Sequence, residues 1–157
     1  MGKIQLSNNK TLKLTNVLCY KLDLMDEDIN LDIQIEQMQS YIRAKGATQI
    51  GPLIQYTNSF VNESGEMEIE MKFLLQCSNF IHAVEPPYSM ESVVRVPDCM
   101  YVRYTGSEDK LSFAYNKIHL EAFEEDIPLK GDSYTIFVDR NDEESVIIAD
   151  VFMEKEN

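Results

Sequence analysis

Alternating and helical spacings of apolar residues divide the chain into two segments with the same order of elements. The clearest alternation is GEMEIEMKF (65–73), where one strand face is apolar and the other is mostly glutamate. A strand with one polar face is typical of an antiparallel sheet. We therefore predict that Met67, Ile69 and Phe73 face a core, while the glutamates face solvent.

The first segment begins with a strand. VLCYKLDLM (17–25) places leucines and a tyrosine on one face. Two shorter alternating stretches before it meet at Asn8-Asn9, which predicts a hairpin turn there.

A helix and a strand pair follow. Apolar residues from Leu31 to Ile42 recur at helical spacing, which predicts a helix over about 31–45. Gly46 can take the left-handed conformation that ends such a helix. Extended structure then resumes at IGPLIQYTNSF (50–60) and leads into the alternating strand.

The same order returns after VEPPYS (84–89). A strand is expected over about 93–104, a helix over about 107–125, and two strands in SYTIFV (133–138) and SVIIADVFM (145–153). The helix start has two alternatives: Thr105 with Glu108 as a capping box, or Ser107 as the cap. Gly46 and Gly131 each precede a strand pair, so we take them as corresponding positions.

These elements predict an α+β fold made of duplicated βαββ halves, about 12–76 and 92–153, within a single domain over 1–157. Two long helices pack on one side of an antiparallel sheet. A chain of 157 residues buries one core rather than two. A groove is expected where the halves meet at a pseudo-twofold axis, and a concave junction of this kind is the default binding site.

The charge is strongly acidic and unevenly placed. The net charge is −13, and the residues after position 50 contain eight basic and twenty-one acidic side chains. Nucleic-acid binding depends on lysine and arginine displacing counterions, so we expect none. Cationic ligands or basic protein partners fit this charge better, although acidic residues also serve solubility alone.

Little in the sequence indicates catalysis, a metal or a cofactor. Cys19, Cys77 and Cys99 form no CxxC pair and are expected to be free thiols in a reducing cytoplasm. His82 and His119 have no partner at metal-ligand spacing. Cys77 and His82 could form a nucleophile–base pair, but a buried, inert thiol is the more common role. No apolar run is long enough for a membrane span, so we expect a cytoplasmic protein.

Two motifs carry a resemblance to a known family. GATQIGPLIQY (46–56) and YTGSEDKLSFAY (104–115) resemble patterns in the two halves of gyrase-inhibitor-like (GyrI-like) effector-binding domains, whose superfamily includes the SOUL haem-binding proteins. The resemblance covers about 12–153. It implies a βαββ duplication whose cleft binds bulky, often aromatic or cationic, compounds, commonly as the sensor of a multidrug transcription regulator. Some similar proteins are hydrolases, but we expect no enzyme here.

The resemblance points to aromatic residues for the groove. Tyr56 and Tyr104 are expected to face each other across it, with Gly106 turning the backbone sharply into the second helix. Alternation puts Tyr101 on the opposite face from Tyr104. Tyr115 on the helix is a further ligand-binding candidate.

One position departs from the family pattern. Many members place a ligand-pairing glutamate two residues before an aromatic residue, and here that position is Thr135, ahead of Phe137. Phe137 remains a ligand-binding candidate. Asp150 could replace the glutamate, because it interrupts the apolar run of the last strand. A carboxylate there is either a rim group or a site group, since burying it unpaired costs several kcal/mol.

Two functions remain open. The first is a stand-alone domain that binds a small hydrophobic or cationic molecule through Tyr56, Tyr104, Tyr115, Phe137 and Asp150. The second is an acidic protein-interaction module that binds a basic partner as an inhibitor or accessory protein. The family's namesake is a stand-alone inhibitor, and the chain is also loosely similar to stand-alone proteins associated with type VII secretion toxin loci. Neither function involves nucleic acid or a membrane.

Overall fold

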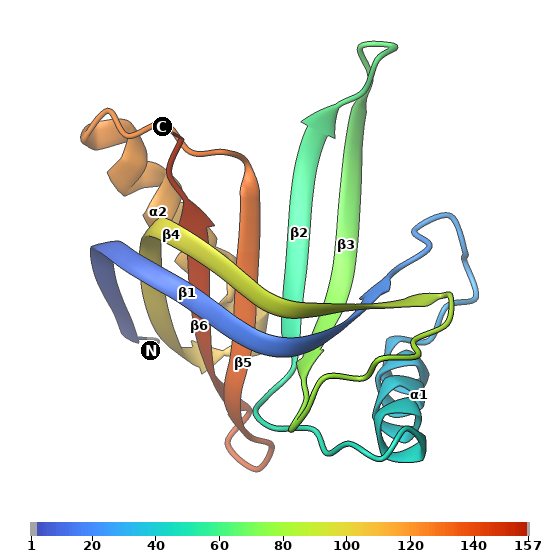
Figure 1. Cartoon of the computed structure of the whole chain (residues 1–157). Coiled ribbons are helices and arrows are strands. Elements are labelled where there is room, and N and C mark those ends of the chain that lie inside the picture. Colours follow the sequence, from blue (N-terminus) through green and yellow to red (C-terminus); the bar gives the residue numbers. More distant parts are fainter. Residues whose placement is uncertain (1–2, 157) are drawn as a thin grey trace.

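The computed structural model describes residues 3–156 and contains the βαββ order twice (Figure 1). The first half consists of β1 (Lys3–Lys21), α1 (Leu31–Ala44), β2 (Ile54–Val61) and β3 (Met67–Gln76). The second consists of β4 (Tyr88–Ser107), the short 3-10 helix η1 (Glu108–Lys110), α2 (Ser112–Glu124), β5 (Asp132–Asn141) and β6 (Val146–Glu154). The predicted α+β fold is confirmed.

The six strands form one antiparallel sheet that closes into a barrel. Their order is β1-β3-β2-β5-β6-β4, with β4 pairing back onto β1. The halves therefore meet at two seams, β2–β5 and β1–β4. Each half contributes its strands in the same order, so a pseudo-twofold axis relates them.

Left-handed backbone positions show how the two halves correspond. Every residue with positive φ in the described chain has a counterpart 80 to 82 residues away in the other half. Glycine, asparagine and aspartate tolerate this conformation better than other residues. The pairs are Asn16 with Asp98, Gly46 with Asp126, Gly51 with Gly131, and Gly65 with Ser145. Gly131 thus corresponds to Gly51, and the predicted match with Gly46 is wrong.

The helices lie outside the barrel and cover different strands. α1 packs over β1 and β3 through Met38 and Ile42, while α2 packs over β4 and β6 through Ala114, Ile118 and Ala122. These buried residues fall on the predicted apolar stripes. A third apolar cluster fills the barrel interior, so a strand that also lies under a helix is buried on both faces, as β6 is over most of its length. Gly46 has a φ of +82° just after α1, as predicted for a helix end.

Strand lengths differ from the sequence predictions. The hairpin at Asn8-Asn9 is wrong, because β1 is one long strand that pairs with β4 and changes register near these residues. β4 begins at Tyr88 rather than near 93. Gly106 lies within β4, buried and paired with Ile147, so it does not turn the backbone.

The turn into α2 is made by η1 instead. Ser107 precedes η1 but makes no side-chain capping bond, and α2 starts only at Ser112, again without a side-chain cap. Neither predicted cap is therefore used. Neither helix in residues 3–156 is long and apolar enough to cross a membrane.

The β2–β3 hairpin extends beyond the barrel (Figure 1). Phe73 is buried under α1 as predicted, but Met67 and Ile69 are exposed, so the prediction that they face a core is wrong. They lie on the predicted face of the strand, but the helix that covers this face does not reach them.

Candidate ligand-binding site

The β2–β5 seam contains the pseudo-twofold axis. Gln55 lies directly opposite Thr135. These two residues are also 80 positions apart, so they are equivalent positions of the two halves, and the axis passes between them. Side chains at this point alternate between two environments. Ile54 and Tyr56 face the barrel interior, whereas Gln55 and Thr57 face outward between the helices.

Tyrosines form a cluster on the inner side of the seam. The rings of Tyr56 and Tyr134 are 4.8 Å apart, and Lys72 Nζ lies 5.6 Å from the centroid of the Tyr56 ring. Burial and nearby carboxylates raise the pKa of Tyr56 to about 12, so its hydroxyl stays protonated at neutral pH. The adjoining cavity, which also contacts Glu91, measures only about 130 Å³. A drug-sized ligand needs roughly 300 Å³ or more.

Asp132 lies at the end of this inner cluster. Tyr56 Oη donates to its Oδ2 at 3.4 Å, while its Oδ1 is buried without a hydrogen-bond partner among the described residues. Burial, followed by repulsion from Glu154, raises the pKa of the Asp132 carboxyl. The charged form of the Asp132 carboxyl is therefore less favourable here than in water.

A larger cavity, about 410 Å³, lies on the outer side of the seam beside α2. α2 contributes Tyr115 and, one turn later, His119. The hydroxyls of Tyr115 and Thr135 are hydrogen-bonded, and burial raises the pKa of Tyr115. Residues of β2, β5, β6 and the segment before β5 complete the lining: Gln55, Thr57, Ser59, Leu129, Gly131, Asp132, Ser133 and Met153.

The α1 side of the seam has different residues at the corresponding positions. At the 80-residue spacing, Phe137 corresponds to Thr57, and Gln39 to His119. Gln39 Nε2 donates to Gln49 Oε1 at 3.0 Å, which engages this side chain within the first half. The bulky Phe137 therefore occupies, on the α1 side, the position that the smaller Thr57 occupies beside the cavity on the α2 side. Phe137 lies on β5 next to the seam but does not line this cavity, and its role in ligand binding stays a prediction.

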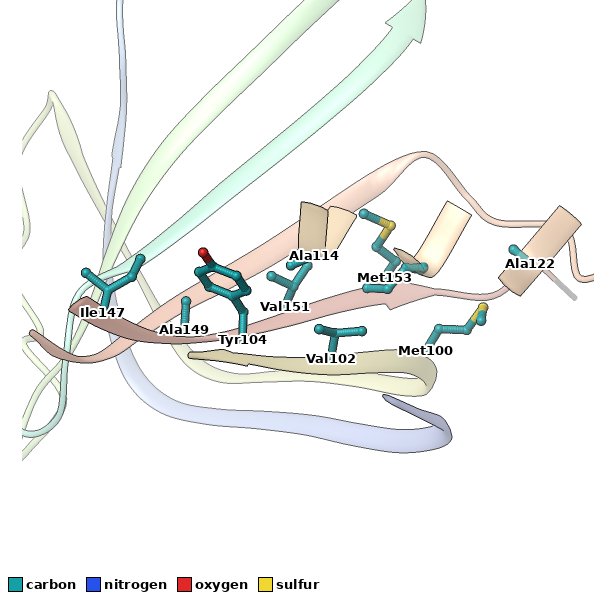
Figure 2. Close-up of a cluster of buried hydrophobic side chains, with 10 residues drawn as sticks. Met100, Val102, Tyr104, Ala114, Ala122, Ile147, Ala149, Val151 and Met153 are labelled. Atoms are coloured by element: carbon teal, nitrogen blue, oxygen red, sulfur yellow. The ribbon is translucent and has the colours of Figure 1, made fainter. Parts of the chain in front are cut away.

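Tyr104 does not face Tyr56, and that prediction is wrong. It is 1% exposed in the cluster beneath α2, between Ala149 and Ala114, and its hydroxyl donates to the Ser107 carbonyl at 2.6 Å (Figure 2). Tyr101 is the tyrosine of β4 on the same inner face as Tyr56. The predicted alternation is right, but the family motif selected the wrong member of the pair.

Asp150 is fully engaged within the protein. Its Oδ1 accepts from Arg103 Nε and Tyr101 Oη, both at 2.8 Å, and its Oδ2 accepts from Arg103 at 2.9 Å. Such bidentate pairs are among the stronger hydrogen-bonded contacts in proteins. The carboxylate is therefore a paired structural group on the inner face. It is neither a free rim group nor a group directed into the outer cavity.

Of the predicted site residues, only Tyr115 lines the outer cavity, while Tyr56 lines the smaller inner one. No pattern in the sequence predicted Gln55, Thr57 or His119 as site residues. The available signal was positional: Gln55 precedes Tyr56 by one residue and so faces the other side of the strand, and His119 follows Tyr115 by one helical turn.

Comparisons with known proteins give a likeness in fold. No family model matches the sequence, and no curated protein sequence matches it. The structure is similar to EcmrR in a cryo-EM structure of the EcmrR–DNA complex in EcmrR-RPo, with a TM-score of 0.68 and 14% identity. The match covers 99% of this chain and 58% of that one, so the chain spans a little over half the length of EcmrR.

Two further structures are similar at lower scores. One is a putative bacterial transcription regulation protein from Staphylococcus aureus MU50, with a TM-score of 0.49 and 9% identity over 95% of this chain and 98% of that one. The other is SAV2435 bound to tetraphenylphosphonium, with a TM-score of 0.46 and 8% identity over 96% and 95%. The likeness to EcmrR shows a shared fold, which is compatible with the GyrI-like fold.

Proposed function

We propose that this chain is a GyrI-like domain that binds a bulky aromatic compound, neutral or cationic, in the cavity between α2 and the β2–β5 seam. The cavity itself carries the proposal. Its volume of about 410 Å³ falls within the range of roughly 300–1,000 Å³ that is usual for small-molecule sites. It also lies where the two halves meet, which is the place expected for a site in a duplicated fold.

The cavity lining suits an aromatic ligand with a few polar groups. Tyr115 offers a ring for stacking, and Met153 offers an adaptable apolar contact. Gln55, Thr57 and His119 supply hydrogen-bond donors and acceptors. The net charge of −13 raises the local concentration of cations over anions. A cationic aromatic compound is therefore the favoured ligand class.

We propose binding without catalysis. Cys19, Cys77 and Cys99 are buried, and burial raises the pKa of each thiol, to about 11 for Cys19 and Cys99. Only a thiolate is a strong nucleophile, and these thiols stay protonated near neutral pH. The Cys77 thiol lies against the Leu75 carbonyl, while the His82 ring packs on Phe80, so each has a different neighbour.

The Thr57→Phe substitution tests this function. It puts a phenylalanine into the cavity lining, matching Phe137 at the corresponding position of the second half, and should fill part of the cavity. We expect calorimetry to show that the protein binds tetraphenylphosphonium, and the neutral analogue triphenylphosphine oxide more weakly. The Thr57→Phe variant should bind the cation at least about tenfold more weakly, which is about 1.4 kcal/mol.

Thr57→Val is the matched control, because it removes the hydroxyl and keeps the size of the side chain. It should bind tetraphenylphosphonium within about threefold of the wild type, since a surface-accessible hydroxyl contributes modestly. The proposed function fails if neither compound binds the wild type, or if Thr57→Phe binds as tightly as Thr57→Val.

A further inference from the structure

Part of the β3 edge is open. β1 pairs with β3 only as far as Lys21 and Lys72, and one further backbone bond joins Leu22 N to Met71 O at 2.9 Å. Beyond this point β1 has ended, and the chain enters the loop that leads to α1. No strand within residues 3–156 pairs with β3 on this side from position 67 to 70.

The backbone groups at this edge point to the side on which β1 pairs with β3 further along the strand. Successive residues of a strand direct their N–H and C=O groups to opposite sides. The Met71 carbonyl faces β1. Met67 and Ile69 lie four and two residues before Met71, so their N–H and C=O groups point to the same side, where no strand pairs with them. The other side of β3 pairs with β2 along its whole length, from Val61 to Ile54. The exposed edge is therefore a template for one more strand.

Apolar side chains surround the open edge. Met25 is 88% exposed and Met67 68%, with Ile69 and Leu24 about half exposed. They line a shallow cavity of about 750 Å³ together with Pro87. These five residues are called the β3 edge surface. Contiguous exposed apolar residues with a polar rim are typical of interaction sites.

The rim of the β3 edge surface is acidic. The segments 21–30 and 61–72 contain eight carboxylates and two lysines. Both lysines are already paired, because Lys21 and Lys72 lie 3.6 and 3.4 Å from oxygens of Glu70. The surface thus presents an apolar floor, free strand hydrogen-bonding groups and an excess of negative charge.

We propose that the β3 edge surface binds an extended, basic segment of a partner protein, which adds to β3 as a further strand. Strand addition uses backbone hydrogen bonds for affinity and alternate side chains for specificity. Apolar residues at every second position of the segment enter the cavity, and the lysines or arginines between them meet the acidic rim. A second copy of this chain is disfavoured, since pairing two β3 edges brings Glu68 and Glu70 close to like charges.

The test uses a short fluorescent peptide that alternates lysine and valine, with a glutamate–valine peptide as the charge control. Fluorescence anisotropy should show binding of the lysine peptide alone, weakening as salt is added. Ile69→Pro removes the edge N–H without breaking the bonds to β2, and it should abolish binding. Met25→Lys should weaken binding at least about tenfold, as expected for a central contact.

Leu120→Lys is the matched control, because it makes the same change from an exposed apolar residue to lysine on α2. It should bind the peptide as the wild type does. If Ile69→Pro has a lowered melting temperature, Ile69→Lys takes its place and should also lose binding. The proposal is overturned if the lysine peptide does not bind at low salt, if Met25→Lys and Leu120→Lys bind it equally, or if sedimentation shows a dimer that Ile69→Pro dissociates.

Discussion

The two halves of the barrel differ in charge at one pair of residues that face each other on neighbouring strands. In the second half, Arg103 lies directly opposite Asp150 and forms a bidentate ion pair with it. In the first half, the corresponding residues are Lys21 and Lys72, which also lie directly opposite each other. Opposite charges stabilise such a pair of strands, whereas like charges weaken it. Glu70 offsets this repulsion from a diagonal position.

The ladders continue differently beyond these positions. In the second half, β4 and β6 remain paired as far as Ser107 and Val146, and Tyr104 is enclosed beneath α2. In the first half, β1 ends at Lys21, and Leu22, the counterpart of Tyr104, makes the last backbone bond to β3. The second half therefore has a closed ladder and a cavity beside its helix, whereas the first half has an open, acidic strand edge.

Truncating the enclosed tyrosine is expected to have the largest effect. Tyr104→Ala removes a fully buried ring and its hydrogen bond, so it should lower the free energy of unfolding by about 3–5 kcal/mol. Leu22→Ala, at the corresponding but less enclosed position, should cost about 2 kcal/mol. Urea denaturation of both variants measures the difference. A cost for Leu22→Ala that equals or exceeds that of Tyr104→Ala would contradict the tighter enclosure of the second half.

Breaking the Arg103–Asp150 ion pair should lower the free energy of unfolding by an intermediate amount. Asp150→Ala leaves the Arg103 guanidinium and the Tyr101 hydroxyl without their acceptor, and we expect a cost of about 1.5–3 kcal/mol. Lys72→Ala relieves repulsion but loses the contact with Tyr56, so its effect should lie within about 1 kcal/mol. The same denaturation experiment in low salt compares the two. A cost for Lys72→Ala that matches Asp150→Ala would remove the contrast between the halves.

The smallest change in stability is expected for a substitution of Asp132, whose counterpart in the first half is Pro52. Burial, and to a smaller extent repulsion from the Glu154 carboxylate, raises the pKa of the Asp132 carboxyl. The folded state therefore binds this proton more readily than the unfolded state, and stability is lost as the pH rises through the folded-state pKa. Asp132→Asn should raise the melting temperature at pH 7, and the gain should fade as the pH falls to about 4. A gain that grows as the pH falls would contradict the pKa shift.

Local patterns predicted the elements well, because each depends on nearby residues. The stripes that end at Ile42 and Ala122 identify the buried helix faces, and Gly46 ends α1 as its conformational freedom allows. The closure of the barrel could not be predicted in this way. It depends on the pairing of β1 with β4 and β2 with β5, between residues that are far apart in the sequence.

The choice between Tyr101 and Tyr104 shows why the site was harder to predict than the fold. Alternation separates their faces, but here one face lies under a helix and the other faces the barrel interior, so polarity does not distinguish them. Tyr115 was predicted from the family motif and does line the cavity. Thr57 was not, because its importance depends on its position near the axis, where its counterpart in the other half is the bulkier Phe137.

Amide chemical shifts of the isotope-labelled protein can show where tetraphenylphosphonium binds. We expect the shift changes to centre on Gln55, Thr57, His119 and Ser133 around the outer cavity. Amides at the inner cavity, such as those of Cys19 and Glu91, should stay unchanged. Changes centred on the inner cavity or on the β3 edge surface, or no changes at all, would contradict the claim that this cavity is the ligand site.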